Sequence, residues 1–142
     1  AAARAMGVIL DTSVLIAAER GALRLEALLL DRAAEPVGVA AVTASELLHG
    51  VHRADAAVRA RRAAFVESLL DIIPVFPFAL REARCHAELW AELSRAGTLI
   101  GPYDMLIGAT ALARGDALAT LNTRDFQRVP GLELVELKAY LS

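Results

Sequence analysis

Two acidic residues each follow a short apolar run, which is where a parallel sheet presents side chains to a ligand. Asp11 comes directly after the run 8–10, and Glu46 lies in the first turns of the helix expected after the run 37–40. Burying a carboxylate beside apolar residues is costly unless hydrogen bonds or a cation compensate. From this stretch alone, a purely structural role for Asp11, in which its carboxylate accepts hydrogen bonds from the N-terminus of the next helix, is as well supported as a chemical role.

The same pattern recurs in the second half of the chain. Asp104 lies in the first turn of a helix whose start Pro102 marks, and Asp125 comes shortly after the apolar run 118–121. The alternative role of Asp104 is to complement the helix dipole, which contributes about 0.3–1 kcal/mol. The alternative role of Asp125 is a cap or a solvated turn.

Carboxylates that follow parallel strands converge on one edge of the sheet. Acids brought together in this way repel one another and raise each other's pKa unless a cation lies between them. Oxygen ligands without nearby cysteine or clustered histidine favour Mg²⁺ or Mn²⁺ over Zn²⁺. The sequence therefore predicts a divalent metal site formed by Asp11, Glu46, Asp104 and Asp125.

The elements that must position these acids alternate along the chain. Apolar runs predict buried strands at 8–10, 37–40, 72–76, 118–121 and 132–137. Helical periodicity predicts helices at 12–20, 22–33, 43–53, 55–70, 80–97 and 102–115. This alternation predicts an α/β fold, a three-layer α/β/α sandwich with a mostly parallel sheet of about five strands.

One helix carries a recognisable apolar stripe. In the helix 80–97, the residues expected to face the core are Leu80, Ala83, Ala87, Trp90 and Leu93. Cys85 and His86 on the same helix are interpreted as structural.

Composition limits the class of protein. With 142 residues, 56% of them hydrophobic, we expect one domain over residues 6–142, preceded by a loose or non-native extension over 1–5. No apolar run approaches the roughly 20 residues of a membrane span. A single cysteine, Cys85, favours a cytoplasmic protein. The net charge of −2 means that any nucleic acid must be held by local arginines or by metal bridging.

Four motifs in order resemble those of PIN-domain ribonucleases, in particular the VapC toxins of VapBC toxin–antitoxin pairs. The motifs are Leu10-Asp11-Thr12-Ser13, Ser45-Glu46-Leu47 with Gly50, Gly101-Pro102-Tyr103-Asp104, and Thr120-Leu121-Asn122-Thr123-Arg124-Asp125-Phe126. The resemblance implies metal-dependent endonucleolytic cleavage of RNA, with Mg²⁺ or Mn²⁺ as the cofactor.

The resemblance also implies roles for individual residues. Asp11, Glu46 and Asp104 match the family's metal ligands. Many members have an aspartate where this chain has Asn122, and others combine an asparagine there with an acid three residues on, as Asp125 does here. We therefore expect Asp125 to be the fourth acid, with supporting residues Ser13, Thr120 and Asn122.

Other residues have weaker signals. His49 lies one helical turn after Glu46 but is more often a surface or core residue. Five arginines could contact phosphates or simply be solvated: Arg53, Arg59, Arg61, Arg62 and Arg124. One helix carries more leucine than a single core contact needs, which suggests a homodimer or antitoxin surface: Leu23, Leu25, Leu28, Leu29 and Leu30.

Two other classes of protein compete with this interpretation. A phosphatase of the haloacid dehalogenase type would need a second aspartate two residues after Asp11, where Ser13 stands. A catalytically inactive PIN-like protein that only binds a partner is the better alternative. The presence of all four acids argues against it.

Overall fold

The computed structural model describes residues 5–142, so residues 1–4 of the predicted extension lie outside the described part. The elements are β1 (Val8–Leu10), α1 (Thr12–Glu19), α2 (Leu25–Asp31), β2 (Val37–Ala40), α3 (Ala41–Arg53), α4 (Ala56–Ile72), β3 (Val75–Phe76), α5 (Leu80–Ala96), α6 (Pro102–Arg114), β4 (Ala117–Ala119), α7 (Thr123–Phe126) and a 3₁₀ turn (Lys138–Tyr140). None of the helices in this part of the chain has the length and apolar character that a membrane crossing requires.

The sheet is parallel throughout, with strand order β3-β2-β1-β4. β1 lies at the centre, where Val8 pairs with Val37 on one side and with Ala117 on the other. The chain runs outward from β1 to β2 and β3, then returns to place β4 on the opposite side of β1. The carboxyl ends of β1 and β4 therefore flank a switch point, the place where open α/β sheets bind ligands.

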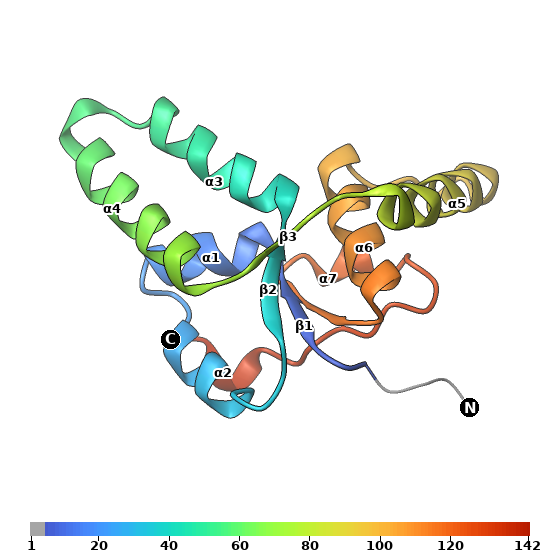
Figure 1. Ribbon diagram of the computed structural model, residues 1–142, viewed down its shortest axis with the longest axis horizontal. Coiled ribbons are helices and arrows are strands. Elements are labelled where there is room, and N and C mark those ends of the chain that lie inside the picture. The colour runs from blue at the N-terminus through green and yellow to red at the C-terminus, as the bar shows by residue number, and fades with distance from the viewer. Residues whose placement is uncertain (1–4) are drawn as a thin grey trace.

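Alternate residues of β1 face two separate cores, because successive side chains of a strand point to opposite faces. Val8 and Leu10 belong to a cluster with residues of α1, α2, α3 and α4, whereas Ile9 packs with residues of α5, α6 and α7. Figure 1 shows the sheet between these two groups of helices. The predicted three-layer α/β/α fold is confirmed.

The sheet has four strands, and the prediction of about five was slightly wrong. The segment 132–137 pairs with β4 only through one bridge, between Leu118 and Leu134, because β4 is itself three residues long. The strand expected at 72–76 is reduced to Val75–Phe76. Ile72 remains in α4, and Pro74 has no N–H with which to continue the pairing.

The helix predicted at 22–33 is shorter, Leu25–Asp31, because the residues before it pair with the C-terminal segment. Leu23 forms an antiparallel bridge with Leu141, and the Arg24 N–H donates to the Tyr140 carbonyl at 2.8 Å. Leu28 is buried, so it does not belong to the surplus apolar surface expected of this helix. Leu30, by contrast, is strongly exposed.

The predicted apolar stripe of α5 was wrong at three positions, because Leu80, Ala87 and Trp90 are all exposed. Trp90 is 52% exposed and Leu80 is 65% exposed, whereas Leu89 and Leu93 are buried. Leu89 faces α6 at Gly108, where an added Cβ would lie 3.9 Å from a Leu89 methyl group. The buried face of α5 is therefore rotated toward Leu89 by its packing on α6.

We predict that Gly38→Ala destabilises the protein by about 1–3 kcal/mol, because a well-packed site cannot absorb an added methyl group. A Cβ at Gly38 would lie 2.4 Å from a ring carbon of Phe76 and 2.7 Å from the Pro74 carbonyl oxygen. Urea unfolding measures the change. Gly50→Ala in α3 is the control, since nothing lies within 4 Å of its Cβ position. This control should stabilise the helix by about 0.5–1 kcal/mol, and a Gly38→Ala protein as stable as wild type would contradict the packing described here.

Candidate active site at the carboxyl ends of β1 and β4

Asp11 occupies the switch point of the sheet, between the end of β1 and the start of α1. It is 3% exposed, and although it is the N-cap residue of α1, its side chain makes no capping hydrogen bond. The helix N-terminus is therefore not the partner of this carboxylate. Asp11 is buried for another reason.

Hydroxyl groups from both flanking elements hold the Asp11 carboxylate. Asp11 Oδ2 accepts hydrogen bonds from Ser13 Oγ at 2.6 Å and from Thr120 Oγ1 at 2.7 Å. Ser13 Oγ in turn accepts from the Leu121 N–H at 3.1 Å, which ties α1 to the end of β4. The hydroxyls of Thr12 and Ser13, at the start of α1, donate to the acidic side chains of Glu46 and Asp11.

Glu46 lies on α3 and is positioned by two threonines. Thr12 Oγ1 donates to Glu46 Oε1 at 2.7 Å, and the buried Thr43 Oγ1 lies 3.0 Å from Thr12 Oγ1. Sequence reasoning missed this contact. The available signal was the spacing of Thr43 and Glu46, which are three residues apart and so lie on the same face of a helix.

Asp104 and Asp125 are linked through one amide group. Asp104 lies in the first turn of α6, and Asp125 lies on α7, a short helix that the sequence did not predict. Asn122 Nδ2 donates to Asp104 Oδ2 at 3.2 Å and to Asp125 Oδ2 at 3.1 Å. The amide thus bridges two carboxylates that would otherwise repel each other.

The four acids share one electrostatic environment. The pKa of Asp104 is raised from 3.8 to about 6, first by burial and then by the charges of Asp11, Glu46 and Asp125. The hydrogen bond from Asn122 lowers this pKa, but not enough to offset the other effects. A carboxylate whose pKa is raised by burial and by three like charges lies in a site suited to a cation.

Within residues 5–142, no three carboxylate, imidazole or thiol groups form a ready-made metal-binding cluster. Thr12 is hydrogen-bonded to Glu46, and Asn122 is hydrogen-bonded to Asp104 and Asp125. The chemistry of the donor set still fits a hard cation, since the groups are all oxygen ligands. Binding one would draw these side chains toward each other.

Four other candidate residues make no hydrogen bond to the four acids. His49 is exposed, and its side chain forms no hydrogen bond or ion pair with any other described residue. Arg59 donates to the Ala54 carbonyl at 2.8 Å, and Arg124 is exposed on α7. The His86 ring on α5 packs against the rings of Phe78 and Trp90.

Known proteins resemble this chain in sequence and in structure. Ribonuclease VapC1 of Rickettsia felis is 35% identical over 135 residues, which cover 94% of this chain and 98% of that protein. The tRNA(fMet)-specific endonuclease VapC of Salmonella typhimurium is 33% identical over 96 residues, 68% of this chain and 71% of that protein. The toxin–antitoxin complex VapBC-5 of Mycobacterium tuberculosis has a chain that superposes with a TM-score of 0.73 at 35% identity, covering 92% of this chain and 97% of that one.

The sequence also matches the PIN domain family directly, over residues 8–132. This range contains β1 to β4 and every acid of the site. The resemblance that the four motifs indicated is confirmed, and the chain belongs to the PIN-domain family, in its VapC branch.

Proposed function

We propose that this chain is a metal-dependent endoribonuclease and the toxin of a toxin–antitoxin pair, acting in the cytoplasm on RNA. The observation that carries the proposal is the convergence of four acids at the switch point, where burial and the charges of the other three acids raise the pKa of Asp104 to about 6. The ribonuclease and tRNA(fMet)-specific endonuclease names of the relatives support RNA as the substrate.

In this proposal Asp11, Glu46 and Asp104 bind Mg²⁺ or Mn²⁺, and Asp125 completes the set. The metal supplies Lewis-acid activation of water and neutralises charge on the scissile phosphate. Ser13 and Thr120 fix the Asp11 carboxylate, and Thr12 orients Glu46. If a protein base accepts a proton from the attacking water, we propose Glu46 or Asp125 for that role.

The two competing interpretations fit the side chains less well. The Ser13 hydroxyl donates a hydrogen bond to Asp11, so it does not stand in for the acid that a haloacid dehalogenase-type phosphatase needs there. An inactive partner-binding protein would have no use for the hydroxyl and amide groups that orient the four acids. Those groups favour catalysis.

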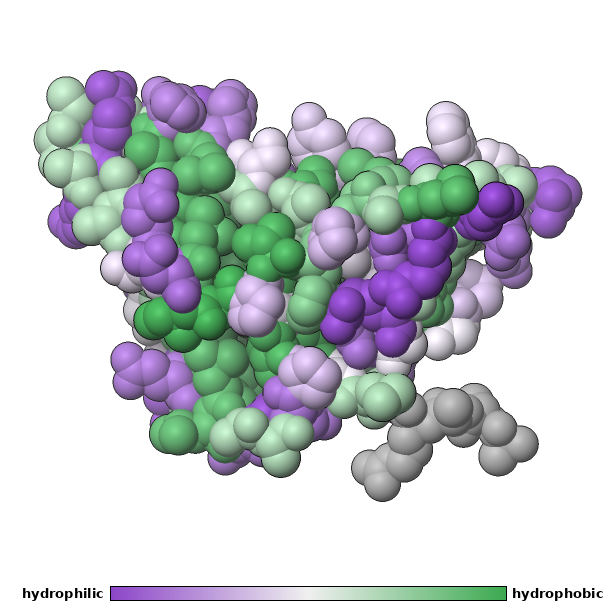
Figure 2. Space-filling model, in the orientation of Figure 1, coloured by the Kyte–Doolittle hydropathy of each residue, from purple (hydrophilic) through white to green (hydrophobic). Residues whose placement is uncertain are grey.

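We propose that the antitoxin binds a hydrophobic groove between α2 and the C-terminal half of α4. The residues that line this groove include Leu25, Leu29, Leu30, Leu69 and Ile72. Figure 2 shows hydrophobic residues gathered over this side of the molecule. An amphipathic helix would cover the groove, and an arginine or lysine reaching the four acids would compete with the metal for the same charge. A homodimer stays a prediction.

We predict that Asp11→Asn and Asp104→Asn each lower RNA cleavage at least 100-fold while the protein stays folded, because each removes a ligand but no core volume. Cleavage of an RNA panel in Mg²⁺ or Mn²⁺ and circular dichroism measure the two effects. Asp55→Asn, at an exposed acid outside the site, is the matched control and should cleave as wild type does. Full activity in either site variant would rule out the proposed ligands.

We predict that Asp104→Asn stabilises the metal-free protein at pH 7.5. Because the folded-state pKa of Asp104 is about 6 rather than 3.8, its protonated form favours folding below about pH 4, and this contribution is lost as the pH rises through 6. The melting temperature of the variant in chelator should exceed that of wild type at pH 7.5 and match it near pH 3.5.

Mg²⁺ should reverse this order, because it binds the folded acid cluster of the wild type. A wild-type protein at least as stable as Asp104→Asn at pH 7.5 in chelator would contradict the repulsion. A wild-type melting temperature that does not change with Mg²⁺ concentration would contradict the metal site.

We predict that the chain arrests bacterial growth and that a small protein encoded beside it restores growth. Raising Mg²⁺ in a cleavage assay should weaken the inhibition, because metal and antitoxin compete for the acids. Leu30→Glu should weaken inhibition while sparing cleavage, since Leu30 lines the groove and is exposed. The toxin assignment fails if wild type arrests growth no more than Asp11→Asn, or if co-expression gives no rescue.

A further inference from the structure

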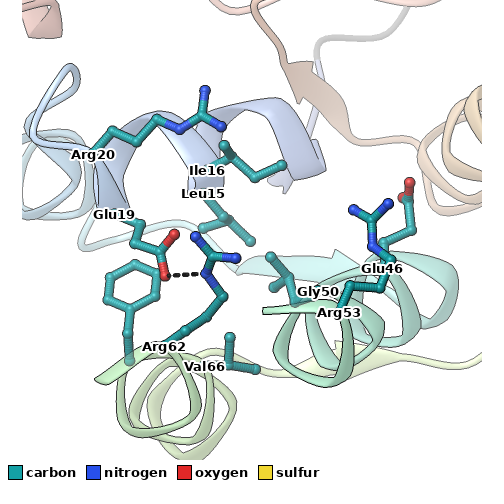
Figure 3. A pocket seen from close by; sticks show the side chains of 11 residues that line it. Leu15, Ile16, Glu19, Arg20, Glu46, Gly50, Arg53, Arg62 and Val66 are labelled. Carbon is teal, nitrogen blue, oxygen red and sulfur yellow. Dashed lines mark hydrogen bonds and ion pairs between the residues drawn. The ribbon is translucent and has the colours of Figure 1, made fainter. Parts of the chain in front are cut away.

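A second groove leads away from the four acids, between α1, α3 and α4. One wall of the groove is formed by α3, through Glu46, Gly50 and Arg53. The opposite wall is the end of α1, with Glu19 and Arg20, and Arg62 of α4 closes the groove. Figure 3 shows Glu46, Gly50 and Arg53 together on α3, with Glu19 and Arg62 at the far end. The groove therefore begins at a predicted metal ligand and ends among guanidinium groups.

The face of α3 explains why the groove is continuous. Glu46, Gly50 and Arg53 are spaced four and three residues apart, so they share one side of the helix over a rise of about 10 Å. Gly50 has no side chain, and nothing lies within 4 Å of the position where its Cβ would stand. A larger residue there would project into the groove.

The charges in the groove favour an anion. The side chains of Arg20 and Arg53 form no hydrogen bond or ion pair with the other residues that the structure describes. Arg62 makes one contact with Glu19, 3.3 Å from Nε to Oε2, and this pair is partly exposed and hence weak. Arg61 lines an adjoining hollow with Glu19, Arg20 and Arg62. The groove thus contains three guanidinium groups and two carboxylates, those of Glu19 and Glu46, and Arg61 adds a fourth positive charge beside it.

We infer that this groove binds the sugar-phosphate backbone of a single RNA strand on one side of the scissile phosphate, with Arg20, Arg53 and Arg62 as the phosphate contacts. The inference rests on the proposed function, because it takes the scissile phosphate to lie among the acids. A protein segment carrying the basic residue expected of the antitoxin would be repelled by these same guanidinium groups. The Glu19 carboxylate limits the affinity by occupying Arg62.

The test measures binding of a fluorescently labelled single-stranded RNA of 12 nucleotides and mixed sequence to the whole protein in chelator. Arg53→Gln should weaken binding about five-fold at 0.1 M salt and lower the slope of log affinity against log salt by about 0.7, as expected for one lost phosphate contact. Glu19→Gln should tighten binding, because it frees Arg62. Gly50→Leu should weaken binding without changing any charge.

Arg95→Gln is the matched control, since Arg95 is an exposed arginine on α5, across the sheet. Wild-type affinity in both Arg53→Gln and Gly50→Leu would overturn the inference. Equal losses in Arg95→Gln and Arg53→Gln would also overturn it, because the effect would then be nonspecific. Variants that change inhibition by the antitoxin but leave RNA binding unchanged would also overturn the inference, because the groove would then bind a protein.

A separate measurement tests the proposed function. That function is wrong if the wild-type protein does not cleave the RNA panel in Mg²⁺ or Mn²⁺. The binding comparison in chelator does not depend on cleavage, so it decides the occupant of the groove in either case.

Discussion

Repulsion among carboxylates at the end of the sheet is the constraint on which the rest of the site depends. Burial and three neighbouring charges raise the pKa of Asp104 to about 6. Every acid accepts a hydrogen bond from a neighbouring side chain: Ser13 and Thr120 donate to Asp11, Thr12 donates to Glu46, and Asn122 donates to both Asp104 and Asp125. These hydrogen bonds fix the carboxylates in place but leave their negative charge, which a divalent cation would neutralise.

The sheet makes this arrangement possible. β1 is buried on both faces, so its end is fixed by two hydrophobic cores rather than one. The strand order puts β4 beside it, and the Ser13 and Thr120 hydroxyls therefore meet at a single carboxylate. The same architecture leaves α3 and α4 extending beyond the sheet, and the groove between them and α1 joins the acids to a group of arginines (Figure 1).

Local patterns in the sequence predicted the parts of the fold that local physics decides. The uninterrupted apolar run of β1, Pro102 at the start of α6 and the acids after the strands are all visible one element at a time. Long-range contacts decided the rest. Leu23 pairs with Leu141 and shortens α2, and packing on α6 turns Leu89 rather than Trp90 inward. The link from Thr12 to Glu46 joins two helices, and no single stretch of sequence contains it.

The central claim is that the four acids bind a divalent cation, and anomalous diffraction from crystals grown with Mn²⁺ tests it most directly. The account predicts one strong anomalous peak or a close pair of peaks within ligating distance of Asp11, Glu46 and Asp104, at roughly 2.0–2.3 Å. Their carboxylates should be drawn closer together than the hydrogen bonds now hold them. A map without a peak at the end of β1, or with Mn²⁺ bound only elsewhere on the molecule, would contradict the account.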